Sequence, residues 1–474
     1  MQTISPLFGS LLIIAVVITA VFTYMLSKHI FDSRKIFFNK LKSINIGKYS
    51  ASNKSVLNVN HESSLVSKPL HDKRFSIGVL LFETLSNNES DEFISSGITS
   101  EIIKHVTNIP NIRISSRLTA YNFKSNETDI KYVADKLNSR FILTGSMQRD
   151  GNNIRVTAQL SDIETNSLIW NQSYNRQIKD LFGVQHDIAK CIVGTVLGEV
   201  KLAETLFAGA IPEYQLDAWG LVQKAYHFWL TSFTPQGILD ACDYLRDALE
   251  IEPEYANARA TLAMLMAQQM TTRICKDYDL CCDAAEELIE TAYSQAPNDI
   301  EVLENAGVTW QNLGQSKRSI NALRRVVKIA PLNLIARGYL ALVLSMTGGR
   351  RGALEAITLI QDNFATAPKH PSAPYWNYFQ AVAEQRLGNT NQAIELAKLS
   401  LSAQPGWVHN YYLLANAYCL KQQPDAAKKV INIAKSIVPS LTTQLYADNV
   451  YKITGGKKNA ESFVGGLVDF GLIT

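Results

Sequence analysis

The spacing of four prolines is the strongest constraint on the fold of this chain. Pro297 and Pro331 lie 34 residues apart, and Pro405 and Pro439 repeat that spacing. In the first of these segments Gly314 lies 17 residues before its closing proline. Because Pro cannot continue a helix and Gly readily ends one, this period is typical of stacked helical hairpins. Stacks of this kind present extended surfaces that bind other polypeptides.

The segment from Ile300 to Pro331 shows how one such hairpin would pack. Small and apolar residues fall on one face of each predicted helix, so the two faces can meet closely. In the first helix these residues are Leu303, Ala306, Gly307 and Trp310, and in the second they are Ser319, Leu323 and Val326.

The segment from Val408 to Pro439 repeats the pattern. The matching residues are Tyr411, Leu414, Ala415, Tyr418, Ala427, Ile431 and Ala434. Both segments resemble the tetratricopeptide repeat (TPR), and looser copies precede and separate them. The resemblance implies an all-α TPR solenoid of about six helical hairpins over residues 213–439, with an insertion near Thr271 to Leu280. Helices in 440–474 are expected to cap its open end.

Residues 75–200 alternate strand and helix patterns. A buried strand is expected at 75–85, then a helix near 91–108, a strand at 111–116 and a second helix at 129–138. Three closely spaced strands and a closing helix at 180–200 follow. Asp150-Gly151 marks a hairpin between the first two of those three strands. The predicted order is β-α-β-α-β-β-β-α, an α+β domain with helices on one face of the sheet.

The stretches FSIGVLLFETL, FILTGSMQRDGNNIRVTAQLSDIETNSLIW and DLFGVQHDIAKCIV resemble the TolB amino-terminal-like domain. In that family the domain precedes TPR arrays in bacterial regulatory proteins. Membrane-bound winged-helix transcription activators and multidomain adenylate cyclases are examples. The roughly 47 residues between Leu26 and Phe75 are too few for a winged helix or a cyclase catalytic domain, so the usual effector half is expected to be missing.

The first residues have a different character. Leu7 to Leu26 carries no charge and is long enough to cross a bilayer, and residues 1–6 lack the basic side chain of a signal peptide. A transmembrane helix is therefore predicted at 7–26, followed by a polar, basic tether at 28–73. The positive-inside rule predicts a single-pass protein of the bacterial inner membrane with its bulk in the cytoplasm. The TolB-like resemblance favours the periplasm as the alternative.

The search for reactive groups favours a protein without enzymatic activity. Lys and Arg number 46 against 43 Asp and Glu, which gives no reason to expect nucleic-acid binding. The eight His are scattered and form no helical metal motif. Cys275, Cys281 and Cys282 are weak metal candidates whose spacing matches no known zinc knuckle, so an inert loop is favoured. No catalytic residue or cofactor is predicted.

Because no catalytic group is predicted, the remaining function is the binding of another molecule. The register of a TPR stack points certain side chains of the first helices toward the concave surface, where aromatic and amide groups suit a peptide. These residues are Glu304, Val308, Gln311, Asn312, Tyr375, Tyr378, His409, Tyr412 and Asn416. Packing between repeats is the competing interpretation, above all for the tyrosines.

The sequence therefore predicts a membrane-anchored regulatory adaptor. Its TPR groove would hold a protein partner, and its TolB-like domain would sense or position. Two alternatives stay open: an accessory subunit of a separately encoded adenylate cyclase or other signalling enzyme, and a degenerate regulator that has lost its effector domain.

Overall fold

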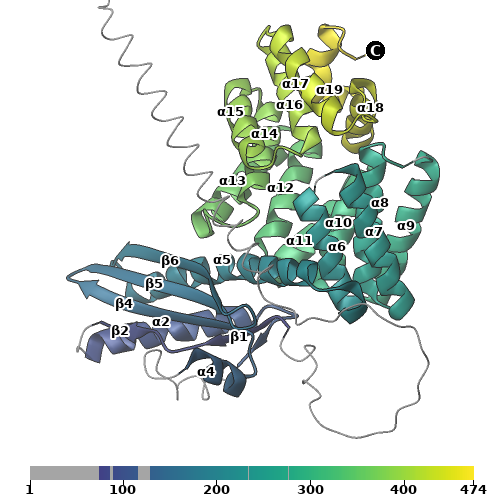
Figure 1. Cartoon of the computed structure of the whole chain (residues 1–474). Coiled ribbons are helices and arrows are strands. Elements are labelled where there is room, and N and C mark those ends of the chain that lie inside the picture. The colour runs from purple at the N-terminus through teal and green to yellow at the C-terminus, as the bar shows by residue number, and fades with distance from the viewer. Residues whose placement is uncertain (1–73, 86–88, 116–128, 233, 276, 474) are drawn as a thin grey trace, which may run out of the picture. The chain divides into compact units, whose positions relative to one another are not determined.

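The computed structural model describes most of the chain beyond residue 73 (Figure 1). The described ranges are 74–85, 89–115, 129–232, 234–275 and 277–473. The predicted transmembrane helix at 7–26 and the tether at 28–73 lie outside them. None of the helices in the described ranges is both long and apolar enough for a membrane span. This finding contradicts the predicted localisation as a single-pass inner-membrane protein.

The first part of the described chain is an α+β domain with the predicted order of elements. Its strands are β1 (Ser76–Val79), β2 (Glu83–Thr84), β3 (Arg113–Ile114), β4 (Phe141–Asp150), β5 (Asn153–Asp162) and β6 (Ser167–Gln177). Its helices are α2 (Glu89–Thr107), α4 (Ile130–Leu137) and α5 (Leu181–Ala210). The predicted strand at 75–85 is thus split into β1 and the two-residue β2.

The strands form one mixed sheet in the order β3-β1-β4-β5-β6, with β2 paired to β4. β1 runs parallel to β3 and β4, whereas the long strands β4, β5 and β6 are antiparallel neighbours. Gly151 closes the β4–β5 hairpin with a φ of 57°, a value that glycine adopts without strain. The hairpin predicted at Asp150-Gly151 is therefore confirmed.

Helices cover both faces of the sheet rather than one. Alternate residues of a strand point to opposite faces, and Ile77 and Phe141 pack in the cluster that α2 and α5 complete. Ile142, the next residue along β4, instead packs against Leu137 of α4 in a separate small cluster. The prediction of a single covered face is corrected, because α4 buries its own apolar stripe on the second face.

Six helical hairpins follow, as the proline spacing predicts. Their helices are α6 (Ala218–Ser232), α7 (Pro235–Ile251), α8 (Ala256–Thr271), α9 (Tyr278–Gln295), α10 (Ile300–Asn312), α11 (Ser316–Ile329), α12 (Leu334–Thr347), α13 (Gly349–Thr366), α14 (Ala373–Leu387), α15 (Thr390–Ala403), α16 (Val408–Leu420) and α17 (Pro424–Ile437). A short 3₁₀ helix, η2 (Glu213–Gln215), precedes them, and α18 (Thr443–Thr454) and α19 (Lys457–Asp469) end the described chain. The insertion expected near Thr271 to Leu280 runs from the end of α8 into the first turn of α9.

Close helix packing within a hairpin depends on small residues. A Cβ added at Gly307 of α10 would lie 2.5 Å from Cγ of Leu323 on α11, so no larger residue fits there without a shift. Gly314, in the turn between these helices, has a φ of 82° and supplies the left-handed conformation that the turn needs.

Helix α5 joins the α+β domain to the hairpins. It runs on to Ala210, so the predicted domain boundary at residue 200 falls inside a helix. A Cβ at Gly194 would lie 2.7 Å from Cγ2 of Thr366, and one at Gly198 would lie 2.3 Å from Nε2 of His370. These two glycines let the end of α13 and the loop after it approach the α5 backbone.

A buried ionic cluster fixes the far end of α5. Arg140 donates two hydrogen bonds to the Asp162 carboxylate, at 2.9 and 2.8 Å, and a third of 2.5 Å to Glu204 of α5. Burial disfavours the charged guanidinium, but hydrogen bonding to Asp162 and the charge of Glu204 raise the pKa of Arg140 above its ordinary value. Arg140 thereby ties two strands and the end of α5 together.

We expect Gly198→Ala to destabilise the chain by about 1–3 kcal/mol, because the new methyl group would overlap the imidazole of His370. That ring cannot retreat freely, since it stacks on Trp376 at 4.9 Å and its Nδ1 accepts a hydrogen bond from the backbone N–H of Ser372 at 3.0 Å. Urea denaturation followed by circular dichroism measures the difference.

Gly465→Ala is the matched control. Its Cβ would meet only Cγ of Glu461, at an ordinary 3.4 Å. Alanine should therefore leave stability unchanged or raise it by about 0.5–1 kcal/mol. Equal stability of Gly198→Ala and the unchanged chain would contradict the close contact between α5 and the array.

Candidate functional site

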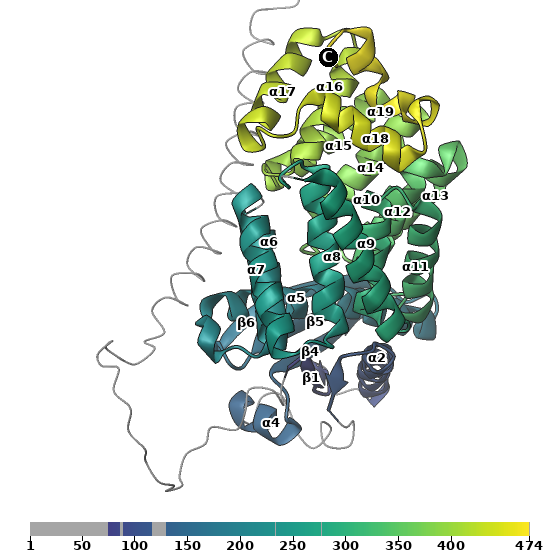
Figure 2. The same cartoon turned by 90° about the vertical axis from the view of Figure 1, so that its right-hand side faces the viewer.

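The C-terminal helices do not continue the stack as a seventh hairpin. They turn back and contact the first helices of earlier hairpins, α12, α14 and α16 (Figure 2). We call the surface of α12, α14 and α16 that α18 and α19 cover the inner face. The helices of 440–474 therefore lie on the side where a TPR array would hold a peptide, and their role as a cap of the open end stays a prediction.

Helix α19 binds the inner face through polar side chains as well as apolar ones. Asn416 of α16 donates to the carbonyl of Ser462 at 2.9 Å and accepts from the N–H of Gly466 at 3.0 Å. Arg386 of α14 donates to the carbonyl of Asn459 at 2.5 Å, and its guanidinium lies 4.4 Å from the ring centre of Phe463. These side chains bond to backbone groups of α19. They therefore fix the position of α19 along the inner face.

Helix α18 reaches much earlier repeats. Asn449 donates to the carbonyl of Thr271, at the end of α8, at 2.5 Å. Ser316, at the start of α11, donates to the carbonyl of Ile453 at 3.1 Å, and Lys452 donates to the hydroxyl of Tyr278 at 3.1 Å. One helix thus bridges the second and third hairpins to the sixth.

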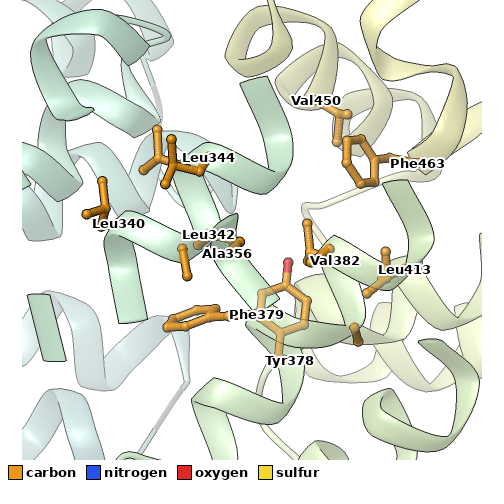
Figure 3. Close-up of a cluster of buried hydrophobic side chains, with 14 of the residues drawn as sticks. Leu340, Leu342, Leu344, Ala356, Tyr378, Phe379, Val382, Leu413, Val450 and Phe463 are labelled. Atoms are coloured by element: carbon orange, nitrogen blue, oxygen red, sulfur yellow. The ribbon is translucent and has the colours of Figure 1, made fainter. Parts of the chain in front are cut away.

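An apolar cluster lies beneath these polar contacts. Figure 3 shows side chains of α12, α14 and α16 facing those of the C-terminal helices. Val450 of α18 and Phe463 of α19 are fully buried there, as is Leu413 of α16. Burying several such side chains stabilises the arrangement by about 1.5–3 kcal/mol each, less the cost of ordering two helices.

In the structure, the nine residues predicted to line a groove lie at several separate places. Tyr412 and Asn416 are fully buried; Tyr412 donates to the carbonyl of Leu441 and stacks on Tyr446 of α18 at 4.6 Å. Tyr375 and Tyr378 pack on Trp407, at 4.7 and 5.6 Å.

The other predicted residues lie at separate places. His409 lines a small cavity between α8 and α16, where burial lowers its pKa to about 4. Val308 and Gln311 are buried, Asn312 is half-buried, and Glu304 faces α5. A peptide-binding role for the nine stays a prediction, and the packing interpretation fits Tyr412 best.

An open cleft of about 110 Å³ lies where α5 meets the array. Its walls are mostly apolar and come from the α2–β3 loop, α5, α10 and the α11–α12 loop. Leu332 of that last loop also packs into the core of the α+β domain. Clefts at the junction of two structural parts are common ligand sites, so this one is the second candidate site.

Charged groups converge on one wall of the cleft. Lys201 of α5 lies opposite Glu301 and Glu304 of α10. Burial opposes the charge of Lys201, but the nearby Glu304 and Glu301 carboxylates raise its pKa above the ordinary value. Burial also raises the pKa of Glu301, and the charge of Lys201 only partly offsets this. Glu304 accepts a hydrogen bond from Asn333 at 2.8 Å.

The thiols near the α8–α9 loop do not make a metal site in the described residues. Burial, followed by the neighbouring Cys275, raises the pKa of Cys281 to about 12, which keeps this thiol protonated near neutral pH. Cys282 contacts the sulfur of Met270 at 2.8 Å. A different group, Glu101, His105 and His186, has ligand atoms close enough to share an ion.

Sequence reasoning missed that group and the cleft for the same reason. His186 is far along the chain from the other two residues, and Lys201 is far from Glu301. The only local signal was the spacing of Glu101 and His105, one helical turn apart. Only the packing of α5 against α2 and α10 brings these side chains together.

The geometry defines the described chain as a helical-hairpin repeat protein of the TPR-like kind, joined to an α+β domain. No known family model matches it. It is 28% identical over 190 residues to "Putative adenylate cyclase 3" of Rhizobium meliloti (strain 1021), which covers 40% of this chain and 32% of that protein. The chain thus spans about a third of that relative.

Comparison with solved structures gives partial matches with low TM-scores. A tetratricopeptide repeat protein from Parabacteroides merdae ATCC 43184 is 16% identical, with a TM-score of 0.31 over 53% of this chain and 91% of that one. PilW, a type IV pilus biogenesis factor, is 20% identical, with a TM-score of 0.31 over 46% and 94%. The TolB-like resemblance of 75–200 is not confirmed by these comparisons.

We expect Lys201→Met to destabilise the chain by about 1–2 kcal/mol near neutral pH, allowing for partial solvent screening. Without the ammonium group, the pKa of Glu301 rises further. A carboxyl whose folded-state pKa is raised opposes folding once the pH exceeds its unfolded pKa. The loss should therefore be larger at about pH 7.5 than at about pH 5.

Urea denaturation at the two pH values measures this change, and Lys317→Met, on the exposed surface of α11, is the control. The control should show no loss at either pH. A loss for Lys201→Met that does not shrink at the lower pH would mean that lost packing, rather than charge, explains the effect.

Proposed function

We propose that this chain is a non-enzymatic regulatory adaptor whose array binds an amphipathic helix of a protein partner on the inner face. The occupation of that face by α18 and α19 carries the proposal. A surface that already holds a helix pair of the same chain has the shape and chemistry to hold a similar helix from another protein.

The contacts of α18 and α19 specify what a partner helix must offer. It needs aromatic and aliphatic side chains one turn apart, as Tyr446 and Val450 are placed on α18. It also needs a backbone that approaches α16 closely, because a Cβ at Gly466 would lie 2.9 Å from the carbonyl oxygen of Asn416. A helix with a small residue beside its aromatic anchor fits this description.

Competition between a partner helix and the chain's own α18 and α19 would regulate access to the inner face. The loop before α18 is short, so its effective concentration at the inner face is on the order of millimolar or higher. A partner helix in solution would have to overcome that advantage. The intact chain is therefore a weak binder, and a signal that loosens α18 and α19 would increase its affinity.

The α+β domain would supply the sensing or positioning role. Helix α5 is part of its core and also a wall of the cleft, so a ligand in the cleft would contact both parts of the chain. The cleft's mostly apolar walls, with Lys201 and Glu301 at one side, suit a small amphipathic ligand.

The full-length variant Val450→Ala/Phe463→Ala tests the proposal. It removes two buried anchors from α18 and α19 but leaves the inner face unchanged, so α18 and α19 should leave that face more often. We expect it to bind a fluorescent peptide of residues 443–469 at least about tenfold more tightly than the unchanged chain does, as measured by fluorescence anisotropy.

Arg324→Ala is the control, because Arg324 forms an exposed salt bridge with Glu355 on the outer helices. It should bind the peptide no better than the unchanged chain. A peptide carrying Val450→Asp and Phe463→Asp should not bind the loosened variant. If the loosened variant retains its helix content but does not bind the native peptide, the inner face does not bind a helix of another molecule.

A second candidate function is favoured by the sequence shared with the Rhizobium meliloti protein. In that case the chain would act with a separately encoded adenylate cyclase rather than as one. The purified chain alone should then form no cyclic AMP from ATP, measured by chromatography with a known cyclase as the positive control. Turnover by the chain alone would overturn the non-enzymatic part of both proposals.

A further inference from the structure

Two helices of the α+β domain bring three metal-ligating side chains together. Glu101 and His105 lie one turn apart on the same face of α2, and His186 lies in the first turns of α5. The Nδ1 atom of His186 is 3.2 Å from Oε2 of Glu101, and Nε2 of His105 is 3.9 Å from that same oxygen. All three ligand atoms lie within 4.8 Å of one another.

The packing of α2 on α5 fixes this arrangement. A Cβ at Gly97, one turn before Glu101, would lie 2.1 Å from Nε2 of Gln185, so the helices cross closely there. Gln185 donates to the carbonyl of Ile94 at 3.2 Å from a buried position. The residue after Gln185 is His186, which the crossing therefore holds beside α2.

One ring nitrogen of His105 lacks the hydrogen-bond partner that a buried histidine usually has. The Nε2 atom of His105 is buried and has no hydrogen-bond partner among the described residues. Buried polar atoms without a partner are rare, and one that faces a carboxylate and a second imidazole points to a missing ligand. A simple ring contact between His105 and His186, whose centres are 4.9 Å apart, leaves that nitrogen unexplained.

We propose that Glu101 Oε2, His105 Nε2 and His186 Nδ1 bind a divalent transition-metal ion of the Zn²⁺ class. Two imidazoles and one carboxylate form a ligand set that such ions prefer. Ligands at about 2.0–2.1 Å in tetrahedral geometry lie roughly 3.3 Å apart. The observed separations of 3.2 and 3.9 Å from Glu101 need small side-chain rotations of Glu101 and His105 as well as of His186, which is 55% exposed. Water completes the coordination on the solvent side.

Two lysine side chains lie near the site. Lys104 lies 2.9 Å from Oε1 of Glu101 and 3.3 Å from Oε2, and it competes with an ion for the carboxylate. Its side chain is 63% exposed and can turn into solvent when the ion binds. Lys190 of α5 also places its charge near His105.

The ion would join α2 to the first turns of α5, and none of its three ligands lines the cleft. It would therefore stabilise the α+β domain without touching the inner face. This inference does not depend on the proposed function, because peptide binding and metal binding use different residues.

The test uses the tag-free full-length chain after dialysis against EDTA. We expect Zn²⁺ to raise its melting temperature and to bind at this site in isothermal titration calorimetry. His186→Ala, the half-exposed ligand, should weaken that binding by about tenfold or more, and His105→Ala should do the same. Co²⁺ should give a visible d–d spectrum that both variants lose.

Lys104→Ala is the matched control, because it changes a neighbour without removing a ligand. It should bind Zn²⁺ as tightly as the unchanged chain or more tightly, since the competing cation is gone. Binding by the two histidine variants equal to that of the unchanged chain would overturn the proposal. So would an unchanged melting temperature together with no binding heat in the unchanged chain.

Discussion

The structure depends on the burial of helix α5 on two sides. Its 30 residues span about 45 Å, enough to pack against the sheet and still reach the hairpins. Ile188 and Ile192 belong to the sheet core, while Gly194 and Gly198 leave room for the end of α13 and the loop after it. Because Glu204 near its end is held by Arg140, α5 cannot slide without breaking a buried ionic contact.

Three separate features of the chain meet this helix or the array that it supports. The cleft lies beside its middle, the Glu101–His105–His186 cluster beside its start, and the inner face beyond it. The inner face is the one that suits a macromolecule, because it already holds two helices through both apolar and backbone contacts. A small ligand suits the cleft, and an ion suits the cluster.

The repeated elements could be predicted from the sequence because their signals are local. Proline spacing, Gly314 and the small residues facing Leu323 are all set within one hairpin. The Asp150-Gly151 turn is local too.

The side on which α18 and α19 pack could not be predicted. It depends on contacts such as Asn449 with Thr271, which lie far apart in the chain. The same limit hid the metal-ligating cluster. It also made Tyr412 and Asn416 resemble groove residues, because a position that faces inward in a repeat can serve a peptide or a returning helix equally well.

The return of α18 to the second hairpin changes how the array should fold. In an open solenoid each repeat contacts only its neighbours, so unfolding can begin at either end and spread. Here the last helices join repeats that are far apart in the chain, which adds non-local contacts and slows folding. The ends can no longer fray independently, and the hairpins should lose their structure together as one cooperative unit.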